Sequence, residues 1–155
     1  MGTCSIADME RITGVKAHTI RIWEKRYKGL SPGRSKGNTR YYDDKQLIKL
    51  LNMMSLVEFG HKISKLFSLS DQEIKVLLEQ GVNKTKSSDK DIEFFITQLL
   101  ASGINYDEST FLNIITNCIS TYGFIDTFMK IVFPMLIRLG LLWGKDNLCP
   151  SKEHF

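Results

Sequence analysis

The sequence predicts a mainly α-helical protein, in which a winged helix-turn-helix with a small β-hairpin wing is followed by an α-helical bundle. Two short amphipathic helical patterns are joined by a turn that contains Gly14, which is typical of a helix-turn-helix. The next stretch, residues 28–42, is basic and holds too many glycines and prolines for a helix. Beyond it, apolar residues recur mostly at helical spacing.

The first helix is predicted over residues 5–13, with the sequence SIADMERIT. Ser5 and Asp8 have the spacing of a capping box, in which each residue satisfies a backbone N–H near the start of the helix. Gly14 follows the last turn, where glycine accepts the left-handed conformation that commonly ends a helix. These signals define a short helix followed by a tight turn.

The second helix is predicted over residues 17–27 and has two unlike faces. The apolar face carries Ile20, Trp23 and Tyr27. The opposite face carries His18, Arg21 and Lys25, with Ile22 beside them. A solvated helix usually interleaves acids and bases, because oppositely charged neighbours stabilise it. Here Glu24 lies near the buried edge, so the outward face has no acid and suits a polyanion.

The wing is predicted as a hairpin of two short extended segments, around Arg34 and around Arg40–Tyr42, linked by the sequence SKGN. It repeats the basic bias of the preceding helix. A helix in the major groove with a basic wing beside it would neutralise several phosphates at once. The alternative, a solvated basic face without a ligand, leaves this repetition unexplained.

The rest of the chain divides at a polar segment without periodicity, NKTKSSDK at residues 83–90, which we interpret as a linker. Before it, helices are predicted over residues 44–59, 62–67 and 70–81. After it, helices are predicted over residues 91–102, 107–122 and 124–142, the last with a kink at Pro134. The expected domains are therefore a DNA-binding domain at 1–82 and an incomplete helical bundle at 91–155.

Charge and composition agree with this division. Residues 1–70 carry 13 Lys and Arg against 6 Asp and Glu, whereas residues 71–155 carry 8 against 11. A basic module joined to a mildly acidic one is compatible with nucleic acid binding by the first. No apolar run is long enough to span a bilayer, and the three cysteines form no C-x-x-C pair. We expect a cytoplasmic protein without disulfides, a metal site or a membrane partner.

The segment SIADMERITGVKAHTIRIWEKRY, followed by L-x-P-x-R and N-x-R-Y-Y, resembles the DNA-binding domain of MerR-family transcriptional regulators. The resemblance covers residues 5–42 without a gap and continues to about residue 70. It implies sequence-specific binding of double-stranded DNA by a winged helix-turn-helix. The DNA-binding residues that we expect are Lys16, His18, Thr19, Arg21, Lys25, Arg26, Arg34, Lys36, Arg40, Tyr41 and Tyr42.

The family pattern also implies individual roles. Lys16 and His18, near the start of the recognition helix, resemble the residues closest to base edges, and Arg21 resembles a phosphate-contacting arginine. Trp23 resembles the aromatic residue that packs this helix onto the core. The wing residues expected to hold the DNA backbone are Arg34, Arg40 and Tyr42. Because symmetric dimers typically bind specific sites as two half-sites, we expect a homodimer or a higher homo-oligomer on a palindromic operator.

The C-terminal part resembles the helical bundle of the cobalamin-dependent, light-sensing branch of the same family. Trp143 is followed by nine residues and then by Glu153 and His154, a spacing that in this branch belongs to the pocket above the corrin ring. The alternative is that Trp143 ends a core helix and that the Glu-His pair is exposed tail. The cobalamin-binding Rossmann domain is missing, so we expect no cofactor in this chain, with cobalamin possible in a longer protein of which it is the N-terminal portion.

A bundle that lacks one helix should leave an apolar groove, and we expect it to mediate self-association. Its candidate residues are Phe111, Ile115, Ile119, Phe128, Val132, Leu136 and Leu139. Other functions remain open: a corrinoid-binding sensor fragment, the cap domain of a cobalamin-dependent protein, or a protein interaction module. An enzyme is not expected, because the three histidines (His18, His61 and His154) are far apart in sequence and no nucleophile motif or carboxylate pair surrounds them.

Overall fold

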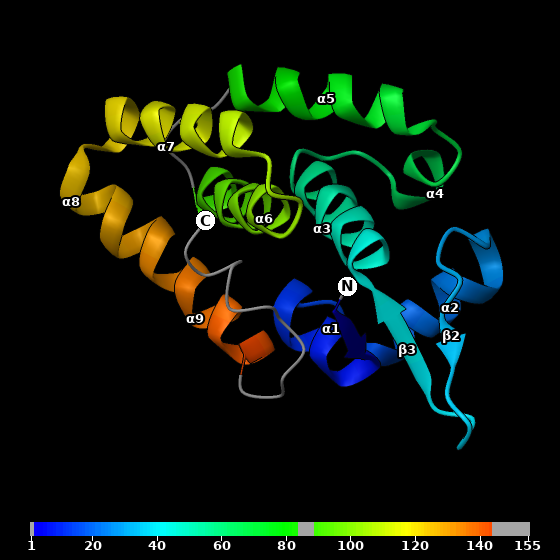
Figure 1. Cartoon of the computed structure of the whole chain (residues 1–155). Coiled ribbons are helices and arrows are strands. Elements are labelled where there is room, and N and C mark those ends of the chain that lie inside the picture. The colour runs from blue at the N-terminus through cyan, green and yellow to red at the C-terminus, as the bar shows by residue number, and fades with distance from the viewer. Residues whose placement is uncertain (1, 84–88, 144–155) are drawn as a thin grey trace.

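A computed structural model describes residues 2–83 and 89–143 of the chain, and over these residues the protein is mainly helical with one small antiparallel sheet, as predicted (Figure 1). The N-terminal elements are β1 (Thr3–Ser5), α1 (Ile6–Thr13), α2 (Ala17–Tyr27), β2 (Gly33–Arg34) and β3 (Arg40–Asp43). They are followed by α3 (Asp44–Glu58), α4 (Ile63–Leu66), α5 (Asp71–Asn83), α6 (Asp89–Ile104) and α7 (Glu108–Tyr122). The last described elements are α8 (Phe124–Thr127), the π-helical turn η1 (Phe128–Val132) and α9 (Phe133–Trp143).

Helix α1 begins and ends as its sequence predicts. The Ser5 hydroxyl accepts from the Asp8 amide at 3.2 Å, and the Asp8 carboxylate accepts from the Ser5 amide at 3.0 Å, which completes the capping box. Gly14 has a φ of 74° and its N–H donates to the Glu10 carbonyl. This left-handed residue turns the chain sharply into α2, so the helix-turn-helix is confirmed.

The sheet has the order β1-β3-β2, so the wing hairpin of β2 and β3 carries a further strand on its other side. In the hairpin, Arg34 pairs with Arg40, and in the outer pair Cys4 lies opposite Tyr42. The hairpin is confirmed, whereas β1 is not among the predicted elements. Three residues are too short for an alternating pattern to be visible, and their pairing with β3 is a tertiary contact.

Helix α6 lies in the middle of the structure and packs along α3 (Figure 1). Phe94, Phe95 and Leu99 of α6 are fully buried and belong to the same core cluster as the α1 and α3 residues Met9, Leu50 and Leu56. Polar contacts also cross this interface, because the Gln98 amide donates to the Ser55 hydroxyl at 2.9 Å. One hydrophobic core therefore extends across residues from both sides of the expected linker. The division into separate domains stays a prediction.

The last helical segment, predicted as one helix kinked at Pro134, is interrupted by η1. The Phe133 amide donates to the carbonyl of Phe128, five residues back, and Pro134 has no N–H with which to continue the ladder. The interruption therefore takes the form of a π-helical turn just before the proline. No helix in the described part of the chain is long and apolar enough to cross a bilayer.

Candidate nucleic-acid interface

Helix α2 is held against the core by its apolar face and by the aromatic side chain of Phe67, the residue that follows α4. Ile20 is fully buried, and Trp23 and Tyr27 are half-buried. The ring at Phe67, immediately after α4, stacks on Tyr27 with centroids 4.9 Å apart and meets Trp23 edge-on at 6.1 Å. Such contacts fix the rotation of α2 about its axis, and thereby determine which side chains face outward.

The outward face of α2 is basic, as predicted. Lys16, His18, Arg21, Lys25 and Arg26 are exposed, and Thr19 is half-exposed. The Arg26 guanidinium lies over the Tyr27 ring at 5.5 Å from its centroid. Glu24, the one acid of α2, has a side chain only 10% exposed. Within α2 itself, the free face thus presents cations and a hydroxyl without a competing carboxylate.

The first turn of α2 is organised by Glu10 of α1. Its carboxylate accepts from the Ala17 amide at 2.9 Å and from the Lys16 ammonium at 3.1 Å. The backbone hydrogen bond and then the Lys16 contact hold the pKa of Glu10 below its ordinary value. Lys16 therefore starts from an exposed ion pair, which is weak enough to exchange for another anion.

The wing presents its own exposed basic residues. Arg34 and Lys36 are exposed, and the Arg34 guanidinium donates to the Asn38 side chain at 2.6 Å, across the turn. Tyr41 is 41% exposed and its ring covers Gly33, its cross-strand partner. A Cβ at Gly33 would lie 2.2 Å from that ring, so a larger residue at this position would require the Tyr41 ring to move.

Tyr42 does not lie where a DNA-contacting side chain would. It is fully buried, and its hydroxyl donates to the Glu24 carboxylate. Burial, and then this hydrogen bond, raise the pKa of Tyr42 above its ordinary value. The expected direct contact between the Tyr42 side chain and DNA does not fit this position, because the ring fills the core between the wing and α2.

Glu24 joins the wing to α2. Besides accepting from Tyr42, its carboxylate lies 3.3 Å from the Arg40 Nε, in a pair whose arginine side chain is 35% exposed. Arg40 is therefore oriented by Glu24 while part of its guanidinium remains accessible. One carboxylate on α2 thus positions two neighbouring residues of β3, which keeps the two basic surfaces in register.

Removing this carboxylate is expected to destabilise the protein. Glu24→Ala leaves the buried Tyr42 hydroxyl without its acceptor, which costs about 1–3 kcal/mol of the free energy of unfolding. Tyr42→Phe in the same background should restore part of that loss, because no polar group is then left unsatisfied. Urea denaturation of the two single variants and the double variant measures a coupling energy of about 0.5–3 kcal/mol. Strictly additive effects would show that the pair makes no contribution.

Sequence reasoning identified the exposed basic residues but missed Glu24 and Phe67 as the residues that position them. Glu24 was placed near the buried edge, yet nothing in its spacing reveals a partner 18 residues away in β3. Phe67 lies 40 residues from Tyr27, and only the folded chain brings the two rings together. The available signal for Phe67 was its position as an aromatic residue at the end of a short helix that contains lysines.

The remaining candidate residues are in the C-terminal part. Trp143 is the last residue of α9, but its side chain lies outside the described part of the structure, as do Glu153 and His154 altogether. Cys118 is fully buried, and burial raises the pKa of its thiol to about 12, so it is a core residue. Among the described residues, no group of three or more His, Cys, Asp or Glu side chains could hold a metal ion.

Comparisons with known proteins agree with this geometry. Residues 4–73 match the family model described as "MerR HTH family regulatory protein". The chain is also similar to the HTH-type transcriptional repressor CarH of Myxococcus xanthus, with 26% identity over 145 residues. This similarity covers 92% of the chain and 48% of the relative, so the chain spans about half of that protein's length.

Proposed function

We propose that this chain is a sequence-specific regulator of transcription that binds double-stranded DNA, because residues 4–73 match the family model of MerR helix-turn-helix regulatory proteins. The observation that carries the proposal is the exposed face of α2, which presents Lys16, His18, Arg21 and Lys25 and no accessible acid of α2 itself. The relative named as a transcriptional repressor supports the same class of function. The proposed role is recognition and involves no catalytic step.

In this proposal the N-terminal part of α2 enters the major groove. Lys16 and His18 lie nearest its start and are the candidates for hydrogen bonds to base edges, which carry sequence information. Arg21 and Lys25 lie one and two turns further on and are placed to contact phosphates. Phosphate contacts fix the orientation of the helix on the duplex without specifying bases.

The wing contacts the backbone beside that groove. Arg34 in β2 and Lys36 beside it are exposed. Arg40 on β3 is half-exposed and is held by Glu24 of α2. Tyr41 offers a hydroxyl on the same hairpin, whereas Tyr42 supports it from inside. Each phosphate that a lysine or arginine neutralises releases counterions, so the affinity for DNA should fall steeply with salt.

Self-association through the C-terminal helices completes the proposal. Of the residues expected in an apolar groove, Ile119, Phe128 and Leu136 are exposed, and the other four are half-buried. The exposed apolar surface is larger than this set and is here named the α8–α9 face; it consists of Phe124, Ile125, Phe128, Met129, Phe133, Leu136 and Ile137. An apolar face of this kind tends to be covered by a partner. A second copy is the proposed partner, since a palindromic site requires two recognition helices.

Placing charge on the α8–α9 face tests this arrangement. Ile125 is 75% exposed, so the double variant Ile125→Asp/Ile137→Asp should fold normally, sediment as a monomer and bind a palindromic duplex more weakly than the self-associated parent chain. Val76→Asp, on the exposed surface of α5, is the matched control and should behave like the parent. A parent chain that sediments as a monomer at every concentration contradicts the proposed self-association.

Cobalamin has no role in this proposal for the chain itself. The residues expected to line its pocket, Trp143, Glu153 and His154, have no described side chains, so the expectation of a cofactor in a longer protein stays a prediction. In a longer protein, a further domain and a second copy of the chain could both contact the α8–α9 face.

A further inference from the structure

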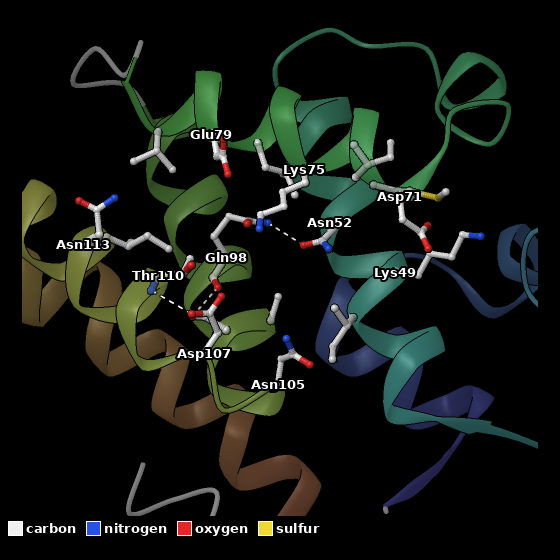
Figure 2. Close-up of a pocket in the computed structure, with 18 of the residues that line it drawn as sticks. Lys49, Asn52, Asp71, Lys75, Glu79, Gln98, Asn105, Asp107, Thr110 and Asn113 are labelled. Atoms are coloured by element: carbon white, nitrogen blue, oxygen red, sulfur yellow. Dashed lines mark hydrogen bonds between the residues drawn. The ribbon is translucent and has the colours of Figure 1, made fainter.

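A separate pocket of about 800 Å³ lies between α3, α5, α6 and the start of α7, on the other side of the bundle from α9 (Figures 1 and 2). Its walls come from α3, which follows the wing, from α5, and from helices beyond residue 89. A cavity of this size falls within the range of small-molecule sites. It includes none of the proposed DNA-binding residues.

The apolar part of the pocket is entirely aliphatic. Its apolar lining residues are Ile48, Met53, Leu69, Ile74, Leu78, Val82, Ala101 and Ile114. Among the described residues that line it there is no phenylalanine, tyrosine, tryptophan or histidine. Without a ring on which a planar ligand could stack, this lining favours a saturated hydrocarbon chain over an aromatic or heterocyclic molecule.

Three lysines from two helices give the pocket its cationic groups: Lys45, Lys49 and Lys75. Within the described chain none of them forms an ion pair. The pocket is also lined by three carboxylates, those of Asp71, Glu79 and Asp107. The Asp107 carboxylate is engaged at the start of α7, where it accepts from the Thr110 amide and the Ser109 hydroxyl, both at 3.1 Å. The lysines and carboxylates of the lining balance in formal charge, and a lysine that is not held in an ion pair can contact the anionic group of a ligand.

Amide side chains converge beside these cations. Gln98 is almost fully buried, and its Nε2 donates to Asn52 Oδ1 at 3.1 Å. Figure 2 shows Lys75 reaching from α5 toward this Gln98–Asn52 pair in the middle of the pocket. A cation next to fixed amide dipoles, above an aliphatic surface, matches a molecule with one anionic oxygen group and a saturated chain.

We propose that this pocket binds an aliphatic carboxylate, with the carboxylate at Lys75 beside the Gln98–Asn52 pair and the chain along the aliphatic lining. The site is placed to affect the wing, because α3 follows β3 directly and the Gln46 amide donates to the Ser31 carbonyl in the segment that leads into β2. A ligand that contacts both α3 and α6 changes the relative stability of arrangements of these helices. This regulatory consequence rests on the proposed DNA-binding function, whereas ligand binding itself does not.

The test uses the full chain and decanoate, kept below its micelle-forming concentration, with amide chemical shifts and calorimetry as readouts. Shifts are expected at pocket residues of α3, α5 and α6. The affinity should increase about three- to fourfold for each methylene from hexanoate to decanoate. Decyltrimethylammonium, with a similar chain and the opposite charge, should not bind there. Shifts confined to the α8–α9 face, or equal binding of the cation, would overturn the proposal.

Charge reversal separates the pocket from other surfaces. Lys75→Glu lies on an exposed position of α5 and should weaken decanoate binding about tenfold or more. Lys130→Glu, on η1 next to the α8–α9 face, is the matched control and should bind like the parent chain. An unchanged affinity of Lys75→Glu for decanoate would contradict the assignment of the carboxylate to Lys75. The amide chemical shifts of the parent chain test the location of the ligand independently of any variant.

The parent chain saturated with decanoate also tests whether the ligand regulates DNA binding. A change in duplex affinity on saturation with decanoate supports coupling to the wing, and an unchanged duplex affinity removes that part of the proposal. If decanoate binds but no duplex is bound at all, the DNA-binding function fails while the pocket assignment stands.

Discussion

Reversing the charge of Arg21 and Lys25 together is expected to weaken binding of duplex DNA by at least about a hundredfold. Each loses a charge-assisted contact worth about 1.5–3 kcal/mol, and each new carboxylate repels the phosphates. Both side chains are exposed on α2, and neither forms an ion pair within the described chain, so Arg21→Glu/Lys25→Glu should fold with unchanged helicity. Fluorescence anisotropy with a labelled duplex and far-ultraviolet circular dichroism measure the two quantities.

The substituted residues and the control variant are chosen so that a loss of DNA affinity can be assigned to α2. Arg40 is left in place because its pair with Glu24 would turn a charge reversal into a structural defect. Lys130→Glu alters the exposed surface of η1, far from α2 in Figure 1, and should bind DNA like the parent chain. If the double variant retains the parental affinity, α2 is not the DNA-binding helix. A loss of affinity in Lys130→Glu would instead indicate that the neighbouring α8–α9 face contributes to binding.

Phe94→Ala is expected to lower the free energy of unfolding by about 3–5 kcal/mol, because it removes a fully buried ring and leaves a cavity. The ring packs edge-on against Phe59, with centroids 4.6 Å apart, and against Phe95 at 5.7 Å. Phe94 follows the expected linker while Phe59 precedes it. The loss should therefore affect the DNA-binding half as well as the bundle.

Trp23 in α2 reports on that half directly. In a Trp143→Phe background it is the single tryptophan, so its fluorescence during urea denaturation follows the recognition helix. One transition, coincident with loss of helicity and shifted to lower urea by Phe94→Ala, indicates a single cooperative unit. Phe124→Ala, at a position 70% exposed, should cost less than about 0.5 kcal/mol. If the Trp23 transition does not move in Phe94→Ala, the two halves unfold independently.

The elements that could be predicted from the sequence are those with local signals. Ser5 and Asp8 predict the start of α1, and Gly14 predicts its end. The glycine-rich segment after Lys28 predicts the hairpin. The same holds for the capping box of α5, where the Ser70 hydroxyl accepts from the Glu73 amide at 3.3 Å. Each depends on contacts between residues a few positions apart, and such contacts are visible in the spacing of residues.

The features that could not be predicted depend on contacts between distant segments. The burial of Tyr42 follows from its place between β1, α1 and α2, and alternation along a four-residue strand does not reveal which of Tyr41 and Tyr42 points inward. The pocket beside Lys75 needs four helices to be packed before it exists. The resemblance to a known family supplied the expected role of Arg40 but not its ion pair with Glu24, because the geometry of this chain determines that contact.

Affinity selection from random duplexes with the full chain tests the central claim, that α2 and the wing read a DNA sequence, most directly. The predicted result is enrichment of an inverted repeat whose half-sites lie about one helical turn, 10–10.5 base pairs, or a multiple of it apart. The enrichment should disappear with Arg21→Glu/Lys25→Glu and persist with Lys130→Glu. Failure to enrich any sequence with the parent chain, or the same enrichment with the α2 double variant, would contradict the account.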